Sequence, residues 1–311
     1  KIHKHIVLPL WNRFQRQHYY KYYNRVASFC SLGMDQIREL QMIEIKKIIH
    51  HAYHNVLYYK NLFDENSIVP AEIRTLSDFT RVPVLHKAEL RRAPDMFVDS
   101  NLDKRNLIKS GTGGTTDSPI PIYYDQKRSD IKTAEMVYFR KWFGWQLESK
   151  VAYIWGAPMD IPNIDSWKFK IMNRLIYRTL YLFASLINDD ILYDYVERIN
   201  NFKPDIIQAY SNPAYLFSSF IVRNRLNVHS PRSVVVTAEP CTSYQRDVIQ
   251  EAFGCPVYSF YGARESGYIA TECTHFRNYH VNCHGLLVEI LKNDKPTKPG
   301  EIGDVVITDL T

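Results

Sequence analysis

A stretch rich in glycine and hydroxyl side chains is the first feature of the sequence that suggests chemistry. It reads Ser-Gly-Thr-Gly-Gly-Thr-Thr-Asp-Ser-Pro over residues 110–119. Glycines let neighbouring backbone N–H groups point into one concavity, and hydroxyls add short donors, so the stretch suits a polyphosphate. It lacks the Gly-Lys-Ser/Thr of the kinase and GTPase P-loop. A solvated linker is the alternative, but strand-like residues on both sides, up to Lys109 and from Ile120, favour a held loop.

A second stretch, Tyr258–Gly267, reads Tyr-Ser-Phe-Tyr-Gly-Ala-Arg-Glu-Ser-Gly and closes an apolar, strand-like run. Tyr261 offers a flat face for a base, and Gly262 allows close backbone approach. The carboxylate of Glu265 suits Mg²⁺ held against phosphate. The alternative is a surface turn with an Arg–Glu pair, which would contribute little energy.

A third stretch, Thr-Ala-Glu-Pro over residues 237–240, follows another buried apolar run. A carboxylate at that place is either part of a helix N-cap region or a ligand contact.

A fourth group concentrates thiols and imidazoles in residues 273–284. Zn²⁺ is bound by such ligands, and the predicted set is Cys273, His275 and His280, with Cys283 as the local candidate for a fourth. The spacing matches no common zinc finger, so solvent-exposed histidines in a hairpin loop remain the alternative.

The elements that must position these residues alternate from about residue 150. Three helices are expected between strands, and they are 189–202, 213–227 and 243–253. Each has a local end signal, such as the proline after the first and the glycine after the last. The strands expected around them are 151–155, 205–210, 233–238 and 256–260. Strand–helix alternation predicts a parallel sheet with crossover helices and an α/β fold.

The two ends of the chain do not show this alternation of strands and helices. Residues 1–105 are expected to be a mainly helical segment packed on the core, since apolar residues from Ile45 to Val56 recur at helical spacing. Residues 106–284 would form the α/β core. Residues 285–311 would form an antiparallel or barrel-like piece, with strands at 286–291 and 304–310 around a polar turn.

Composition narrows the class of protein. The 311 residues are 45% hydrophobic and 23% charged, which excludes a disordered chain. The net charge of +6 is too small and too evenly spread to indicate nucleic acid. The nearly apolar run 175–187 is too short for an integral membrane span. Five scattered cysteines indicate a reducing compartment, so a cytoplasmic location is expected.

In their order and distances, the first three stretches resemble motifs of the adenylate-forming (acyl-CoA synthetase-like) superfamily. The chain is most similar to the phenylacetate–CoA ligase and CapK branch. That branch carries Thr-Gly-Gly-Thr-Thr-Gly-x-Pro, Gly-Ala-Glu-Pro, Tyr-Gly-Ser-Arg-Glu and Gly-Glu-x-Gly-x-Val-Val-x-Thr-x-Leu segments. They are matched by residues 112–119, 237–240, 261–265 and 300–310. Four motifs in order over about residues 105–311 are strongly specific for the superfamily. The Cys-x-His…His group also resembles a segment that many CapK-type proteins carry.

The resemblance implies ATP-dependent activation of a carboxylic acid. The carboxylate attacks the α-phosphorus of ATP, pyrophosphate leaves, and the acyl-adenylate is passed to CoA or to an amine, for which a sugar amine is one option. ATP and Mg²⁺ are the implied cofactors, CoA a further one and structural Zn²⁺ another. Carried over by position, the phosphates would be bound by Thr112, Gly113, Gly114, Thr115 and Thr116. Adenine would be bound by Ala238, Glu239, Pro240, Tyr261 and Gly262, and Mg²⁺ by Glu265. The acyl group would contact Trp155, Gly156, Tyr210, Ser211 and Pro213. Thr115 and Glu265 would be the catalytic residues.

Two departures from the family pattern matter. Asp117 and Ser118 stand before Pro119 where the family has glycine and a variable residue, and a carboxylate there would repel triphosphate. The family's ribose-binding Thr-Gly-Asp motif and small C-terminal lid domain, with its catalytic lysine, would follow Thr311. We expect the chain to be truncated before that domain, and to bind nucleotide better than it turns over.

Two alternatives come from other classes of protein. One is a catalytically inactive nucleotide- or acyl-binding module in a surface-polysaccharide or secondary-metabolite pathway. The other is a zinc-stabilised interaction protein.

Overall fold

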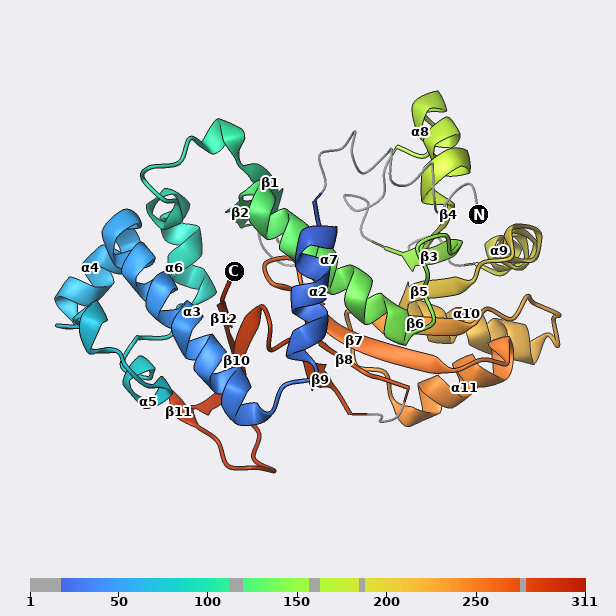
Figure 1. Cartoon of the computed structure of the whole chain (residues 1–311). Coiled ribbons are helices and arrows are strands. Elements are labelled where there is room, and N and C mark those ends of the chain that lie inside the picture. Colours follow the sequence, from blue (N-terminus) through green and yellow to red (C-terminus); the bar gives the residue numbers. More distant parts are fainter. Residues whose placement is uncertain (1–17, 112–119, 157–162, 185–187, 275–277) are drawn as a thin grey trace. The chain divides into compact units, whose positions relative to one another are not determined.

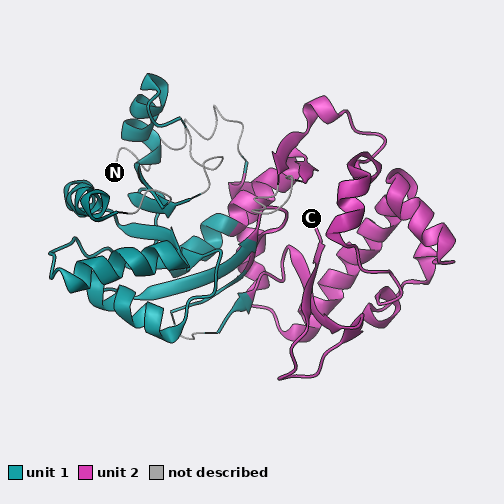
Figure 2. Cartoon of the chain, turned by 180° about the vertical axis from the view of Figure 1, so that it is seen from behind, with its two compact units in different colours: residues 1–18, 136–262, 270–280 teal, residues 19–135, 263–269, 281–311 magenta. Residues whose placement is uncertain are grey.

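The computed structural model describes residues 18–111, 120–156, 163–184, 188–274 and 278–311. The predicted loop 112–119 and His275 lie outside these ranges. The chain forms two compact units, each assembled from separate segments (Figure 2). Unit 1 contains residues 1–18, 136–262 and 270–280, and unit 2 contains residues 19–135, 263–269 and 281–311.

The first part of the chain is helical, as predicted (Figure 1). Its α-helices are α2 (Tyr20–Phe29), α3 (Met34–Asn55), α4 (Leu57–Glu65), α5 (Leu76–Phe79) and α6 (Lys87–Arg92). Short 3₁₀ turns separate them, η2 (Pro70–Glu72), η3 (Pro94–Phe97) and η4 (Lys104–Asn106). A hairpin of β1 (Ile108–Gly111) and β2 (Pro121–Tyr124) follows. The long helix α7 (Gln126–Trp142), for which the sequence analysis gives no element, comes next.

Strands and helices alternate after α7 as expected, but two helical segments and one strand within residues 167–183 were not predicted. They are β3 (Val151–Trp155), α8 (Trp167–Met172) with the π-turn η6 (Asn173–Tyr177), β4 (Thr179–Phe183), α9 (Asp189–Phe202), β5 (Ile206–Tyr210), α10 (Ser211–Arg223), β6 (Ser233–Thr237), α11 (Ser243–Phe253) and β7 (Val257–Ala263). The shorter β8 (Gly267–Thr271) and β9 (His280–Val281) complete the sheet. Its order is β4-β3-β5-β6-β7-β8-β9.

The five strands from β4 to β7 pair in parallel, which confirms the predicted α/β class. The register sets Val151 of β3 opposite Ile206 of β5, and Ile206 opposite Ser233 of β6. Every residue of β6 is buried, as expected of a central parallel strand.

Capping side chains, glycine and proline mark where several helices begin and end. The side chain of Asn188 accepts a hydrogen bond from the N–H of Ile191 at 3.0 Å and caps α9, which ends at Lys203 before a proline. Helix α11 begins with a Thr242–Gln245 capping box and ends at Gly254, whose φ is +63°. Helix α10 begins at Ser211, two residues before the predicted Pro213, since proline fits within a first helical turn.

The last segment forms a small antiparallel sheet, which confirms the antiparallel prediction for residues 285–311. It contains β10 (Leu286–Lys292), β11 (Lys295–Pro296) and β12 (Asp304–Asp309), in the order β11-β10-β12. The amide of Gln41, in α3, donates to the carbonyls of Cys283 and Leu286, both at 3.1 Å. The early helices and the last strands of unit 2 are therefore joined directly.

Each unit has its own hydrophobic core. The core of unit 1 lies among the parallel strands and α9, α10 and α11, and includes Phe217 and Phe253. The core of unit 2 joins residues of α3 and α4, such as Ile45 and Phe63, to Leu287 and Leu310 of the last segment.

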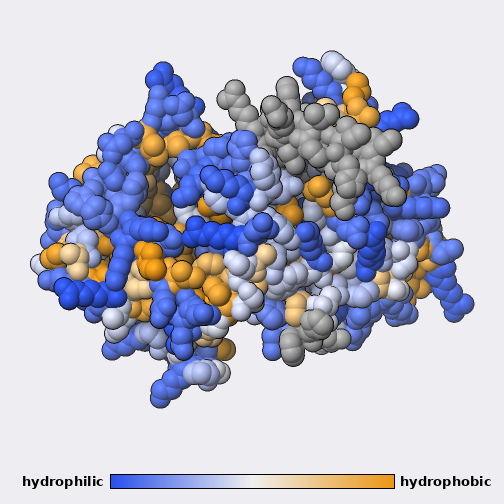
Figure 3. Space-filling view, in the orientation of Figure 1, coloured by the Kyte–Doolittle hydropathy of each residue, from blue (hydrophilic) through white to orange (hydrophobic). Residues whose placement is uncertain are grey.

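The surface visible in Figure 3 is mostly hydrophilic, with apolar residues in small groups. Among the described helices, none combines the length and the apolar character that a membrane crossing needs.

Candidate functional site

The β1–β2 hairpin frames the predicted phosphate loop. The two strands are antiparallel, and Gly111 pairs with Pro121 across them. The strands on both sides of the predicted loop are therefore paired with each other, while residues 112–119 lie outside the described residues.

The Tyr261–Glu265 stretch reaches the start of that loop. The guanidinium of Arg264 donates a hydrogen bond to the carbonyl oxygen of Gly111 at 3.0 Å, across 153 positions of sequence. Two stretches that the sequence analysis assigned to one nucleotide thus touch within unit 2. Glu265, the next residue, is exposed and presents a carboxylate beside this contact.

Helix α7 holds the backbone around Glu265 from both sides. The ammonium of Lys132 donates to the carbonyl of Arg264 at 2.5 Å, and Arg128 donates to the carbonyl of Ser266 at 3.0 Å. A Cβ at Gly267, whose φ is +79°, would lie 3.1 Å from two Lys132 side-chain carbons. This turn therefore requires glycine at that position.

Lys132 and Arg128 form a clamp on the turn that carries Glu265, and burial shifts the pKa of Lys132. The pKa of Lys132 is lowered by burial and by the positive charge of Arg128, while the carboxylates of Asp309, Glu265 and Glu135 oppose the shift. Lys132 thus senses the carboxylate of Glu265 electrostatically.

Arg128 is itself part of a buried network in unit 2. It donates to Asp309 at 2.9 Å and lies 3.4 Å from Glu135, which in turn lies 3.3 Å from His284. Burial raises the pKa of Asp309, and Arg128 counteracts that rise. Arg128, Lys132 and Glu135 were not predicted from the sequence. A signal was present, because their spacing places three charged residues on one side of a helix.

In unit 1, the predicted acyl-binding residues gather at the carboxyl ends of strands. The rings of Trp155, at the end of β3, and Tyr210, at the end of β5, lie 4.4 Å apart between centroids. A Cβ on Gly156 would lie 3.5 Å from the Tyr210 ring, so the glycine sits directly against that ring. Ligands of open parallel sheets bind at this edge.

The Thr237–Pro240 stretch lies beside these aromatic residues. The hydroxyl of Ser211 donates to the Glu239 carbonyl at 2.8 Å, and the N–H of Asn212 donates to the Glu239 carboxylate at 3.2 Å. Ala238 adopts a left-handed backbone with φ of +72°. The structure therefore brings Ser211 and Glu239 together as one corner at the ends of β5 and β6. Pro213 is the third residue of α10, which starts at this corner.

Tyr261 lies near the end of β7 and is 47% exposed, so its ring is open to a ligand. A buried ion pair supports this strand. The Glu272 carboxylate accepts hydrogen bonds from Arg246 at 2.7 Å and from the Ser259 N–H at 2.8 Å.

Part of the predicted zinc group is in place. The Nε2 atom of His280 lies 3.1 Å from the Sγ atom of Cys273. Cys283 instead donates to the Val281 carbonyl at 3.2 Å. Across the described ranges, which omit His275, no group of three His, Cys, Asp or Glu side chains is placed to hold a metal ion.

Curated proteins similar in sequence to this chain include protein CapK and several phenylacetate-coenzyme A ligases. Protein CapK of Staphylococcus aureus is 25% identical over 265 residues, which are 83% of this chain and 57% of that protein. A phenylacetate-coenzyme A ligase of Aromatoleum evansii is 22% identical over 249 residues, 78% of this chain and 54% of that protein. The ligase of the same name from Escherichia coli K12 is 24% identical over 299 residues, 90% and 64% of the two chains. The chain thus spans about half to two thirds of the length of these curated relatives.

Among solved structures, a 2-hydroxyisobutyryl-CoA ligase in complex with 2-HIB-AMP and CoA matches with a TM-score of 0.71. Its sequence identity is 18%, and the match covers 90% of this chain and 61% of that one. This likeness confirms the fold. No protein-family model matches the chain. In its four motifs and in these relatives, the chain is similar to the phenylacetate–CoA ligases and CapK of the adenylate-forming superfamily, and its fold is similar to that of a CoA ligase.

Proposed function

We propose that this protein activates a carboxylic acid with ATP and passes the acyl group to CoA or to an amine. The observation that carries the proposal is the hydrogen bond from Arg264 to Gly111. It brings the start of the phosphate loop and the carboxylate-bearing stretch together, as a shared triphosphate requires. The similarity to the phenylacetate-coenzyme A ligases supports the same reaction.

In the first step, a carboxylate oxygen of the substrate attacks the α-phosphorus and pyrophosphate leaves. We assign phosphate binding to residues 112–116, with Thr115 nearest the reacting phosphate. Glu265 has the exposed, hard oxygen ligands that Mg²⁺ prefers, and this ion would neutralise phosphate charge when bound. Adenine would contact Tyr261, Gly262 and the Ala238–Pro240 stretch.

In the second step, the acceptor attacks the acyl carbonyl and AMP leaves. The acyl group would contact Trp155, Gly156, Tyr210, Ser211 and Pro213, whose aromatic rings suit an apolar or aromatic acid. We favour the thiol of CoA as acceptor because several relatives are named coenzyme A ligases. A sugar amine is the second acceptor to test. The five cysteines, all within the described ranges, form no disulfide bond, which supports a reducing compartment such as the cytoplasm.

Exchange of labelled pyrophosphate into ATP tests the first step. The native protein is expected to show exchange that depends on one acid of a panel, and Glu265→Gln is expected to lower it at least a hundredfold. Glu251→Gln, an exposed carboxylate on α11, is the matched control and should retain exchange.

Calorimetry measures Mg·ATP binding separately from catalysis. ATP binding without exchange under any acid would identify an inactive nucleotide-binding module. Absence of both binding and exchange would overturn the proposal. If exchange occurs, the product formed with CoA or with an amino sugar, read by mass spectrometry, decides the acceptor.

We also propose a structural Zn²⁺ held by Cys273, His275 and His280, with Cys283 as candidate fourth ligand. The 3.1 Å approach of His280 to Cys273 supports it. Metal analysis after purification without chelators should find one zinc per chain in the wild type and none in Cys273→Ser. A metal-free wild type would rule the site out.

A further inference from the structure

A basic and apolar segment of unit 1 has no part in the proposed function. Residues 166–188 contain no Asp or Glu, and Lys168, Lys170, Arg174 and Arg178 lie close together within them. In the structure this segment supplies α8, η6 and β4. Its composition is typical of surfaces that bind anionic partners.

Helix α8 and η6 expose a row of large apolar side chains. Trp167, Ile171 and Leu175 are 67%, 49% and 53% exposed, and their spacing of four residues places them along one side of the turns. In Figure 3 the apolar residues of α8 stand out between hydrophilic ones. Such a row beside cations marks an interaction surface.

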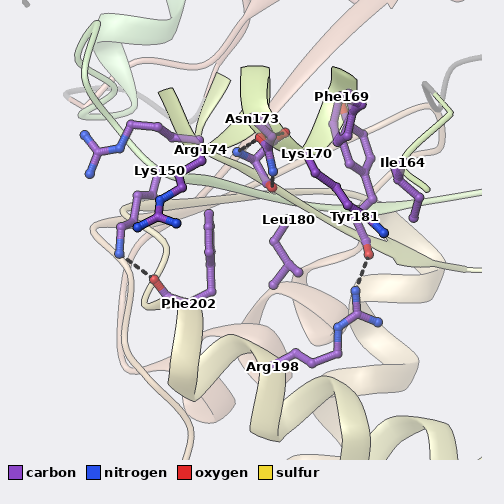
Figure 4. Close-up of a pocket in the computed structure, with 12 residues that line it drawn as sticks. Lys150, Ile164, Phe169, Lys170, Asn173, Arg174, Leu180, Tyr181, Arg198 and Phe202 are labelled. Atoms are coloured by element: carbon purple, nitrogen blue, oxygen red, sulfur yellow. Dashed lines mark hydrogen bonds between the residues drawn. The ribbon is translucent and has the colours of Figure 1, made fainter. Parts of the chain in front are cut away.

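A pocket of about 420 Å³ lies beside this helix (Figure 4). Of its described lining residues, five are Lys or Arg and none is Asp or Glu. Asn173, Thr179 and five aromatic or aliphatic residues form the rest of the wall. The lining includes Lys150, Lys170, Arg174, Arg178, Arg198 and Phe169.

The positive charge of the pocket is only slightly neutralised. Lys150, Arg178 and Arg198 donate to backbone carbonyls at 2.7, 2.5 and 3.0 Å, and a carbonyl carries no net charge. Arg198 also lies 3.4 Å from the Asp194 carboxylate at the surface. Lys170 is exposed, and like Arg174 it forms no ion pair with a carboxylate within the described ranges. The pocket therefore presents excess cationic charge to solvent.

The backbone around the pocket is firmly held. The side-chain amide of Asn173, at the start of the π-turn, donates to the Thr179 carbonyl at 2.7 Å and accepts from its N–H at 2.7 Å. Arg178 adopts a left-handed conformation with φ of +52°. π-turns and strained non-glycine residues occur frequently at functional sites.

The pocket lies apart from the candidate active site within unit 1. Lys150 directly precedes β3 and Arg178 directly precedes β4, so these cations lie at the amino ends of the parallel strands. Trp155 and Tyr210 lie at the carboxyl ends. The two sets of residues thus occupy opposite ends of one sheet.

We propose that α8, η6 and this pocket bind the surface of a membrane that contains anionic phospholipid. A lipid phosphate would be held by Lys170 and Arg174 at the mouth of the pocket, while Trp167, Ile171 and Leu175 enter the interface. Charge complementarity favours this partner, because basic residues near an anionic bilayer are attracted to its surface. Exposed Trp and Leu beside Lys and Arg are typical of segments that lie in the membrane interface. The proposal is independent of the ligase activity.

Vesicle co-sedimentation tests the charged half of the site. The wild type is expected to bind vesicles of phosphatidylcholine with phosphatidylglycerol, and not vesicles of phosphatidylcholine alone. Lys170→Glu should weaken binding about tenfold or more, since it removes one attraction and adds one repulsion. Lys46→Glu makes the same charge change at an exposed position of α3 and should bind as the wild type does.

Leu175→Ser tests the apolar half. It should weaken vesicle binding severalfold, whereas Leu57→Ser, at a residue 55% exposed on α4, should leave binding unchanged. Circular dichroism checks that each variant is folded.

Three results would overturn the proposal. They are absence of binding to anionic vesicles, equal losses in Lys170→Glu and Lys46→Glu, and Lys170-dependent binding of soluble phenyl phosphate without vesicle binding. The last result would assign the pocket to a free phosphorylated metabolite.

Discussion

Arg264 and Gly111 connect two sequence motifs that lie far apart in the chain. The guanidinium needs a carbonyl at hydrogen-bond distance, and Gly111 supplies it at the end of β1. The motif that residues 261–265 resemble, Tyr-Gly-Ser-Arg-Glu, also has an Arg-Glu pair at this place. Here the arginine ties the turn to Gly111, and the next residue, Glu265, is exposed.

Ala238 is a constrained residue of the candidate adenine-binding stretch. Its φ of +72° is costly for a β-branched side chain, and the residue is exposed, so packing contributes little there. We expect Ala238→Val to lower the free energy of unfolding by about 1–2 kcal/mol and to weaken Mg·ATP binding. Urea denaturation and calorimetry measure the two effects.

Ala238→Gly is the matched control, because glycine adopts this conformation without strain. It should unfold at the same urea concentration as the wild type or a higher one. A valine variant as stable as the glycine variant would show that the conformation of Ala238 stores no strain.

Asp117 is a second residue whose role follows from charge. It stands where the family has glycine, next to the proposed triphosphate site. We expect Asp117→Gly to bind Mg·ATP about tenfold more tightly, since it removes one like-charge repulsion. Asp117→Asn should recover most of that gain by removing charge alone. Unchanged affinity in both variants would show that this carboxylate faces away from the nucleotide.

Among the elements, helix α7 positions the turn that carries Glu265. Lys132 and Arg128 hold the carbonyls of Arg264 and Ser266, one on each side of that residue. We expect Lys132→Met to destabilise the protein by about 1–2 kcal/mol, since it leaves a carbonyl without its charged donor. Mg·ATP binding should weaken in the same variant. Lys127→Met, at an exposed position of α7, is the control and should change neither quantity.

The clamp also predicts a dependence on pH. The pKa of Lys132 is lowered in the folded protein, so between that value and 10.5 the unfolded chain binds more protons. The free energy of unfolding therefore rises with pH through this interval. Urea titrations at several alkaline pH values should show a shallower rise for Lys132→Met than for the wild type. Parallel curves for the two proteins would contradict the burial of this ammonium.

The elements that sequence could predict are those whose ends carry local signals. Helix α9 has Asn188 before it and Pro204 after it, and α11 ends at Gly254, so both were predicted with the bounds observed. Strand β4 was missed, because Thr179–Phe183 lies within one long apolar run and nothing local marks its start. Helix α7 was missed because charged residues occupy part of its buried side.

The same distinction applies to the candidate site. Motif residues such as Tyr261 and Glu265 could be proposed as candidates because they stand in short stretches that resemble a family motif. The network that anchors them could not, since Arg128 and Asp309 are 181 positions apart and no local pattern encodes their pairing. The pocket beside α8 likewise depends on which side chains the folded strands bring together.

At the scale of the whole molecule, each of the two units encloses its own core. Cys255 belongs to the core of unit 1, and burial raises the pKa of its thiol to about 11. Only about one in a thousand of these thiols is ionised at pH 8, and the thiolate is the reactive form. We therefore expect iodoacetamide to modify Cys255 only as unit 1 unfolds.

Peptide mass spectrometry across a urea series measures this reaction. Cys30, which is exposed, serves as the internal control and should be modified in the absence of urea. Modification of both cysteines at equal rates in the folded protein would contradict the assignment of Cys255 to a closed core.

The interleaving of the two units has a consequence for synthesis on the ribosome. All segments of unit 1 have been made once residue 280 has been added, so its central sheet can close while translation continues. The apolar sides of α3 and α4 must wait for Leu287 and Leu310, more than 200 residues later. During that interval the nascent chain carries unsatisfied hydrophobic surface, which is a natural substrate for chaperones. Helices α3 and α4 are thus completed by residues that are translated much later.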